Sequence, residues 1–290
     1  MTRSFDPSVL GAADAWQAGS VALAAIDPDG LVAVHGPLDV PRPWASVTKL
    51  LTGYVALVAV DRGLLDLDES AGPPGATVRH LLAHASGLAF DDPSVISPPG
   101  RTRIYSNAGF DALAAVVEAR AGRPFAALVR EWILGPLGMS GTSLVGRPSQ
   151  GLVGTIADLA AFALELLRPQ VLPAAALAAA TTVAFPGLRG VLPGVGRFDP
   201  LDWGLGFEIR DGKTPHWTGT RNSPRTFGHF GASGAFLWVD PDAAVALACL
   251  PERQFGPWAL AAWPSLSDGV LRAHALGLLH GDFTPEAPAP

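Results

Sequence analysis

Ser46 and Lys49 stand three residues apart at the start of the apolar run Leu50–Val60. This spacing places both side chains on one face of a helix, where they can touch. A serine that attacks a carbonyl carbon needs a proton acceptor, and a buried lysine with a lowered pKa can act as one. The chain has only two lysines among its 20 cationic residues, and arginine cannot lose its proton in a protein. The pair is therefore a candidate nucleophile and base, although so short a motif is also typical of a helix cap beside a solvated lysine.

Two more polar stretches can complete such a site. Tyr105 and Asn107 stand in a polar loop just before the periodic stretch 107–122. The phenol of Tyr105 can transfer a proton to or from the serine if a cation lowers its pKa. Asn107 can donate to a substrate carbonyl and accept from a lysine, and it is also a good N-cap for the following helix. The third stretch, 229–234, has glycines that let a substrate backbone approach closely, and a backbone N–H there can stabilise an oxyanion.

Taken together and in this order, these motifs resemble the three signatures of the penicillin-recognising serine hydrolases: Ser46-x-x-Lys49, Tyr105-x-Asn107 and His229-Phe230-Gly231. The similarity runs from about Val21 to Leu250 and is greatest to the class C β-lactamases with their related D-alanyl-D-alanine carboxypeptidases and esterases. It implies an α/β plus all-α architecture, the serine β-lactamase/penicillin-binding-protein-like transpeptidase fold. In that fold an antiparallel sheet is flanked by helices and carries an inserted helical subdomain.

The resemblance also implies a role for each matching residue. Ser46 would be acylated, and Lys49 would accept its proton or tune the acceptor. Tyr105 would act as the base in acylation and as the acid for the leaving group. The backbone N–H groups of Ser46 and Ala232 would form the oxyanion hole. The residues expected to bind the substrate are Asn107, His229, Gly231 and Ala232. No cofactor and no metal are implied.

The third motif departs from the Lys-Thr-Gly of the β-lactamases, because His229 replaces the cation and Phe230 the hydroxyl that hold a carboxylate. A histidine with an ordinary pKa of about 6.5 is mostly neutral and cannot replace a lysine. Arg221 and Arg225 precede the motif and could offer another anion contact, although solvated loop arginines are the simpler interpretation. The missing cation also predicts activity that favours alkaline pH.

Esterase branches of the family tolerate such changes in the third motif. We therefore expect a serine hydrolase that acts on a small-molecule ester through an acyl-enzyme on Ser46, with amides and thioesters as further possible substrates. Alternatives with the same nucleophile are a β-lactamase, a D-Ala-D-Ala-type carboxypeptidase and an acyltransferase. An alternative from another class is a non-catalytic binding module that retains the fold.

The elements that must position these residues come from both ends of the chain. Two β-type runs flank Asp29-Gly30, a strong hairpin signal, and β-type patterns return after residue 200. Helices are expected over 46–62, 107–122, 124–134, 155–167 and 263–279. We therefore predict an α/β subdomain made of 1–62 and 200–283, a mostly helical subdomain over 63–199, and a disordered tail at 284–290. The active site is expected in the crevice between the two parts, and the Gly/Pro-rich stretch 185–200 can shape it.

The composition excludes several other classes. The net charge of −6, without a basic block, argues against nucleic acid as a partner. No apolar stretch reaches membrane length, and the first residues lack the apolar core of a signal peptide, so a cytoplasmic location is expected. The single cysteine, Cys249, excludes an internal disulfide. Nothing in the sequence indicates the oligomeric state.

Overall fold

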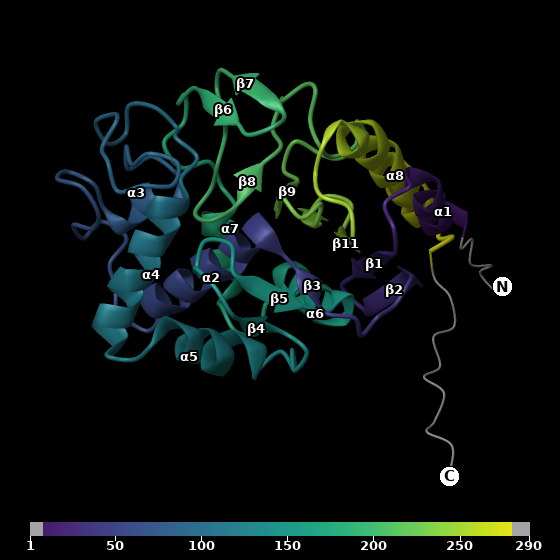
Figure 1. The fold of residues 1–290 in the computed structure, drawn as a ribbon, viewed down its shortest axis with the longest axis horizontal. Coiled ribbons are helices and arrows are strands. Elements are labelled where there is room, and N and C mark those ends of the chain that lie inside the picture. Colours follow the sequence, from purple (N-terminus) through teal and green to yellow (C-terminus); the bar gives the residue numbers. More distant parts are fainter. Residues whose placement is uncertain (1–7, 280–290) are drawn as a thin grey trace, which may run out of the picture.

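The computed structural model describes residues 8–279, and a six-stranded antiparallel sheet lies at its centre (Figure 1). The strand order is β2-β1-β11-β10-β9-β8. The strands are β1 (Val21–Asp27), β2 (Gly30–His35), β8 (Glu208–Ile209), β9 (Phe227–Phe230), β10 (Phe236–Asp240) and β11 (Val245–Pro251). The central neighbours β1 and β11 are far apart in the sequence and pair with Leu23 opposite Cys249. The sheet is therefore assembled from both ends of the chain.

Helices and short strands surround this sheet. The α-helices are α1 (Ser8–Gly11), α2 (Thr48–Asp61), α3 (Val78–Leu82), α4 (Asn107–Ala121), α5 (Phe125–Val129), α6 (Ile156–Leu167), α7 (Ala174–Ala180) and α8 (Pro257–Ala275). Shorter helical turns are η1 (Ala12–Trp16), η2 (Ala45–Val47) and the π-type η3 (Arg130–Leu134). The strands β3 (Arg42–Pro43), β4 (Ser143–Leu144) and β5 (Leu152–Gly154) form a small sheet, and β6 (Gly190–Leu192) pairs with β7 (Gly196–Phe198) as a hairpin.

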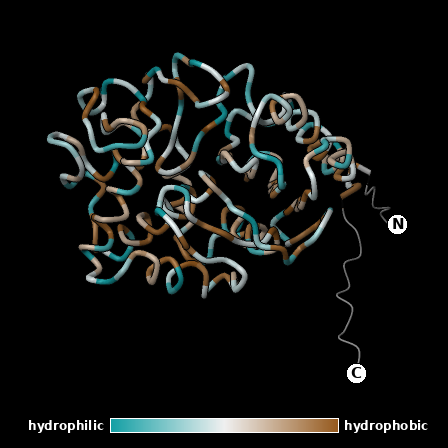
Figure 2. Tube along the Cα trace, in the orientation of Figure 1, coloured by the Kyte–Doolittle hydropathy of each residue, from teal (hydrophilic) through white to brown (hydrophobic). Residues whose placement is uncertain are grey.

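The two faces of the central sheet belong to two hydrophobic cores. Side chains alternate along a strand, so Ala24 and Ile26 of β1 pack into one core together with α2 and α6. Leu23 and Ala25 point the other way and pack into a second core together with α8. Figure 2 shows the corresponding pattern along the chain, with hydrophobic segments along the strands and helices and hydrophilic ones in the outer loops. Burial on both faces explains why β1 and β11 are almost continuously apolar.

Most helix boundaries follow the local sequence. Gly122 ends α4 in the left-handed conformation, with φ +65°. Thr155 caps α6 by accepting a hydrogen bond from the Asp158 backbone N–H at 3.1 Å. The prediction for α8 was wrong at its start, because the helix begins at Pro257 and not at residue 263. Proline fits the first helical position, and the helix continues through Pro264.

The proposed division into subdomains stays a prediction. Residues 63–199 contain α3 to α7 and the short strands β4 to β7. However, α6 from this range packs directly against β1, β10 and β11 of the central sheet. The tail 284–290 lies outside the described residues. No helix within 8–279 combines the length and the hydropathy needed to cross a bilayer.

Candidate active site

Ser46 lies in the short turn η2, immediately before α2 begins at Thr48, and not within the helix itself. Ala45 precedes it with a φ of +46°, a left-handed conformation that is unfavourable for any residue with a Cβ. The end of β9 runs against this turn. A Cβ added to Gly231 would lie 2.6 Å from the Trp44 carbonyl oxygen and 2.9 Å from the Ser46 nitrogen. Gly231 therefore allows the strand to support the strained turn that presents Ser46.

Lys49 lies in the first turn of α2 and is completely buried. Its Nζ donates hydrogen bonds to Ser46 Oγ at 3.2 Å, to Asn107 Oδ1 at 2.6 Å and to the Ser149 carbonyl oxygen at 2.9 Å. None of these acceptors is a carboxylate. Burial lowers the pKa of Lys49 to about 7, against the attraction of Asp111, which raises it. A substantial fraction of this lysine is therefore neutral near pH 7.

A charged layer, made of Arg147, Asp91 and Asp111, positions Asn107 and Ser149, the two other hydrogen-bond acceptors of Lys49. Arg147 pairs with Asp91 at 2.7 Å and with Asp111 at 2.5 Å. Asp91 accepts a hydrogen bond from Asn107 Nδ2 at 3.1 Å, and Asp111 accepts one from the Ser149 backbone N–H at 3.0 Å. The first bond fixes the orientation of the Asn107 amide, so that its oxygen faces the lysine.

Tyr105 is buried, and its hydroxyl is hydrogen-bonded to Ser46. Burial raises the pKa of Tyr105, and the hydrogen bond to Ser46 offsets only part of this rise. The condition that a cation lowers the pKa of Tyr105 is thus not met. Lys49 Nζ lies over the ring, 4.8 Å from its centroid, and is itself only partly protonated near neutral pH. Tyr105 is therefore a neutral phenol that can donate a proton.

His229 lies on β9 and is buried. Its Nδ1 donates to the Phe230 carbonyl oxygen at 2.5 Å, because a carbonyl can only accept. This leaves Nε2 as an acceptor, and within the described part of the chain it has no hydrogen-bond partner. Burial, with a further contribution from Lys49, lowers the pKa of His229 to about 3. His229 is therefore neutral and supplies no positive charge in place of the family's lysine.

Ser46, Tyr105, His229 and Ala232 line one cavity of about 200 Å³, here called the Ser46 cavity. Its other lining residues are Phe90, Leu192, Pro193, Gly194, Phe230 and Phe255. Within residues 8–279, the backbone N–H groups of Ser46 and Ala232 donate to no protein acceptor. They remain available for an oxygen atom bound in this cavity.

The predicted site residues differ in whether they line the Ser46 cavity or only support the residues that do. Asn107 contacts Lys49 but does not line the Ser46 cavity, and Gly231 acts through its backbone. Sequence reasoning missed Ser149 and Arg147, which lie in a loop about a hundred residues after Lys49, and their partners Asp91 and Asp111. None of these residues belongs to a recognised motif. Sequence reasoning also left open how the stretch 185–200 contributes. Leu192, Pro193 and Gly194 from that stretch form one wall of the cavity.

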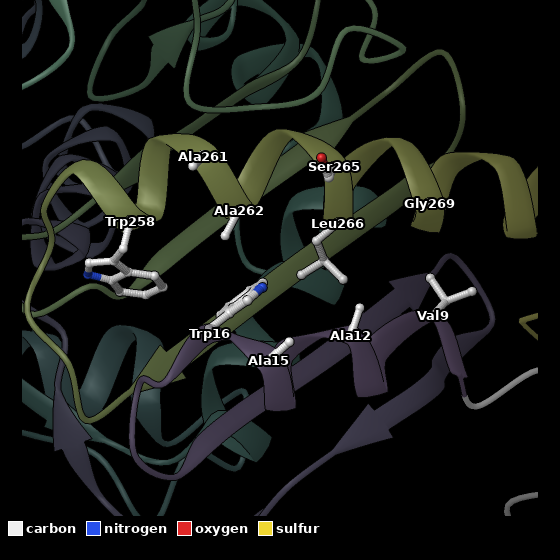
Figure 3. A pocket seen from close by; sticks show the side chains of 10 residues that line it. All are labelled: Val9, Ala12, Ala15, Trp16, Trp258, Ala261, Ala262, Ser265, Leu266 and Gly269. Atoms are coloured by element: carbon white, nitrogen blue, oxygen red, sulfur yellow. The ribbon is translucent and has the colours of Figure 1, made fainter.

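A larger cavity of about 620 Å³ lies elsewhere, between η1 and α8 (Figure 3). Trp16 and Trp258 line it together with alanines and other apolar residues. Ser265 supplies a hydroxyl, and among the described residues that line this cavity none is titratable. Its size alone therefore does not make it a candidate active site.

Comparisons with known proteins identify the family and the fold of this chain. The model of the β-lactamase family matches residues 13–267. This chain belongs to the β-lactamase family. A curated relative, the D-alanyl-D-alanine-carboxypeptidase/endopeptidase AmpH of Escherichia coli K12, is 28% identical, and the match covers 40% of this chain and 40% of AmpH. The chain thus matches about two-fifths of the length of that relative.

Solved structures confirm the predicted fold. A β-lactamase from Mycobacterium bovis has a TM-score of 0.91 and 51% identity, covering 92% of this chain and 99% of the other. Simvastatin synthase LovD from Aspergillus terreus has a TM-score of 0.76 and 18% identity, with coverage of 92% and 98%. EstCE1, a hydrolase with promiscuous acyltransferase activity, has a TM-score of 0.74 and 16% identity, with coverage of 91% and 97%. The last two show a shared fold only. The comparisons therefore establish the β-lactamase family and its fold.

Proposed function

We propose that this family member is an esterase that acts through an acyl-enzyme on Ser46. The observation that carries the proposal is the position of Lys49, whose Nζ lies 3.2 Å from Ser46 Oγ with a pKa lowered by burial to about 7. A base with a pKa near the working pH combines a useful neutral fraction with a good driving force for proton transfer.

In acylation, Ser46 Oγ attacks the ester carbonyl carbon, and its proton passes to neutral Lys49. The carbonyl oxygen becomes an oxyanion, which the free N–H groups of Ser46 and Ala232 stabilise. The carbon–oxygen bond to the alcohol then breaks, and the neutral phenol of Tyr105 donates the proton that the alkoxide needs. Tyr105 regains its proton from protonated Lys49, which restores the neutral base.

In deacylation the same groups act in the reverse order. Water attacks the acyl carbon of the Ser46 ester, with its proton taken by Lys49 directly or through Tyr105. The oxyanion again lies against the two N–H groups. Collapse of the intermediate breaks the bond to Ser46 Oγ, which regains a proton and releases the acid.

The lining of the Ser46 cavity favours a simple ester over a β-lactam or a peptide carboxylate. His229 is neutral, and among the described residues that line this cavity none carries a fixed positive charge. A carboxylate next to the scissile bond would therefore be desolvated without a partner. The second candidate is a β-lactamase, because the Mycobacterium bovis protein that is 51% identical is described as one.

Parallel assays with p-nitrophenyl butyrate and a chromogenic cephalosporin test this choice. We expect the ester to be hydrolysed and the cephalosporin to be hydrolysed much more slowly, with both activities lost in Ser46→Ala. Rapid cephalosporin hydrolysis with little esterase activity would overturn the esterase proposal in favour of the second candidate. Equal activity in Ser46→Ala would contradict the acyl-enzyme itself.

A further inference from the structure

A second groove adjoins the Ser46 cavity. Its volume is about 340 Å³, and the two hollows share Phe90, Tyr105 and Pro193. The second hollow is here called the arginine groove, because three arginines line it: Arg103, Arg189 and Arg197. The Ser46 cavity therefore lies next to a positively charged space, with Tyr105 lining both.

The β6–β7 hairpin forms one wall of this groove and is fixed to the segment that leads to Tyr105. The Arg103 backbone N–H donates to the Arg189 carbonyl oxygen at 3.0 Å. A Cβ added to Gly190 would lie 2.4 Å from the Arg103 carbonyl oxygen, so only glycine permits this close approach. Val191 pairs with Arg197 across the hairpin, and both line the groove. The hairpin therefore holds its arginines at a defined place beside the active site.

The charges in the groove are of one sign. Among the described residues that line it there is no carboxylate. The side chains of Arg189 and Arg197 are exposed, and within residues 8–279 neither forms an ion pair. By contrast, Arg225 pairs with Asp242 at 2.7 Å and lines neither hollow.

Arg103 adds a third positive charge beneath the other two. Its guanidinium group donates hydrogen bonds to four backbone carbonyl oxygens, those of Ala83, Ala184, Phe185 and Leu201. These carbonyls satisfy its hydrogen bonds, and the Asp202 carboxylate offsets part of its charge. A buried charge of this kind raises the affinity of the groove for an anion.

Apolar side chains separate these charges from the nucleophile. Phe90 is 52% exposed and Val191 is 46% exposed, so both side chains present apolar surface to a ligand. Both line the arginine groove, and Phe90 also lines the Ser46 cavity. This arrangement suits a ligand with an apolar stem that ends in an anionic group.

We infer that the substrate carries a carboxylate or phosphate-type group on an apolar stem, and that Arg189 and Arg197 bind this group in the arginine groove. The inference rests on the proposed function for the reaction at Ser46, and it specifies which class of ester the protein hydrolyses. A planar guanidinium group binds carboxylate and phosphate oxygens through paired hydrogen bonds. The groove thus supplies, at a different place, the anion recognition that His229 does not provide.

Three p-nitrophenyl esters with acyl chains of similar length test the inference: the valerate, the hemi-glutarate and the 4-phosphonobutyrate. We expect kcat/KM to be higher for at least one anionic ester than for the neutral valerate, and this preference to fall at high salt. The preferred anion distinguishes a carboxylate from a phosphate-type group. Acetyl esters of 4-hydroxybenzoate and of 4-hydroxybenzamide repeat the test with the anion on the leaving group.

The variant Arg189→Gln/Arg197→Gln should lower the anionic-to-neutral ratio of kcat/KM by roughly tenfold, because two exposed ion pairs are lost. The matched control Arg130→Gln/Arg168→Gln removes two exposed positive charges outside the groove and should leave the ratio unchanged. An equal ratio in the wild type and the groove variant, in both ester series, would overturn the inference.

If no ester is turned over, the esterase proposal fails for these compounds. Binding of the esters to the inactive variant Ser46→Ala then tests the arginine groove separately. Calorimetric titration with hemi-glutarate and valerate esters should show tighter binding of the anionic ester. Adding Arg189→Gln/Arg197→Gln to Ser46→Ala should remove that difference. Equal binding of both esters to Ser46→Ala would overturn the inference.

Discussion

The two lysines of this chain are both buried, yet they have different kinds of partner. Lys213 Nζ lies 2.8 Å from Glu208 Oε1, in an ion pair whose side chains are both about 2% exposed. The same carboxylate accepts hydrogen bonds from His216 Nε2 at 3.1 Å and from Trp217 Nε1 at 3.0 Å. Burial alone would raise the pKa of Glu208, but the attraction of Lys213 and His216 outweighs it and lowers the pKa. This region is a fixed structural ion pair.

Lys49 is equally buried, but its partners are a hydroxyl, an amide oxygen and a backbone carbonyl. These groups accept hydrogen bonds without contributing a full negative charge. The nearest compensating carboxylates, Asp91 and Asp111, are themselves paired with Arg147. Burial therefore lowers the pKa of Lys49, and its proton becomes exchangeable at neutral pH. A buried lysine thus becomes a base when a carboxylate partner is missing, and a structural cation when one is present.

Removal of the active-site amine should have the largest effect. We expect Lys49→Met to lower kcat/KM for p-nitrophenyl butyrate by about 10³-fold, because the proton acceptor of Ser46 is lost. Lys49→Arg is the matched control, since arginine keeps the charge but cannot accept a proton. Steady-state kinetics measures the activity of both variants, and circular dichroism verifies that they fold. An Lys49→Arg variant with most of the wild-type activity would show that only the charge is needed.

Removal of the other lysine should affect stability and not chemistry. Lys213→Met leaves the Glu208 carboxylate buried without its main partner, and we expect the free energy of unfolding to fall by about 3–5 kcal/mol. Urea unfolding measures this change, and kcat/KM per folded molecule should stay within a few-fold of the wild type. The double variant Lys213→Met/Glu208→Gln should recover part of the lost free energy of unfolding. A catalytic defect as large as that of Lys49→Met would erase the contrast between the two sites.

The two tyrosines offer a parallel contrast. Tyr105 is hydrogen-bonded to Ser46, whereas Tyr54 is buried in the core and donates to Glu165 Oε1 at 2.5 Å. We expect Tyr105→Phe to lower kcat/KM for an alkyl ester such as ethyl butyrate by about 10²-fold, because the leaving alkoxide loses its proton donor. The loss should be smaller with p-nitrophenyl butyrate, whose phenolate leaves without a proton. Tyr54→Phe should lower stability with little change in kcat/KM. If the two variants have equal activity, Tyr105 takes no part in proton transfer.

The pH dependence should show the smallest and most specific effect. Because protonated Lys49 cannot accept a proton, kcat/KM should rise up to about pH 7 and then level off. The preference for alkaline pH stays a prediction, and the rise described here has burial of Lys49 as its cause. The attraction of Asp111 raises the pKa of Lys49. The variant Asp111→Asn should therefore move the rising limb of the pH–rate profile to lower pH.

The matched control for this shift is Asp242→Asn, which removes a carboxylate from the exposed pair with Arg225. Its pH–rate profile should coincide with that of the wild type. A shift of the Asp111→Asn limb to higher pH, or an equal shift in both variants, would contradict the assignment of the limb to Lys49.

Local patterns predicted much of this fold and the identity of the central residues. The hairpin at Asp29-Gly30, the cap at Thr155 and the three spaced motifs each depend on neighbours within a few residues, and together they indicated the family. The environment of Lys49 could not be predicted in the same way. Ser149 and Asp111 reach it through tertiary packing, and the pKa values of Lys49 and Tyr105 depend on burial, which spacing does not specify. The same holds for Arg189 and Arg197, because only the fold places their hairpin beside Tyr105.

The most direct test of the central claim is an NMR titration of protein labelled with ¹³C at the lysine Cε positions. Only two lysine signals are expected, and Lys213→Met identifies the signal of Lys49 by elimination. The Lys49 signal should titrate with a midpoint near pH 7. A Lys49 signal that still reports a charged ammonium group above pH 9 would contradict its role as the neutral base of Ser46.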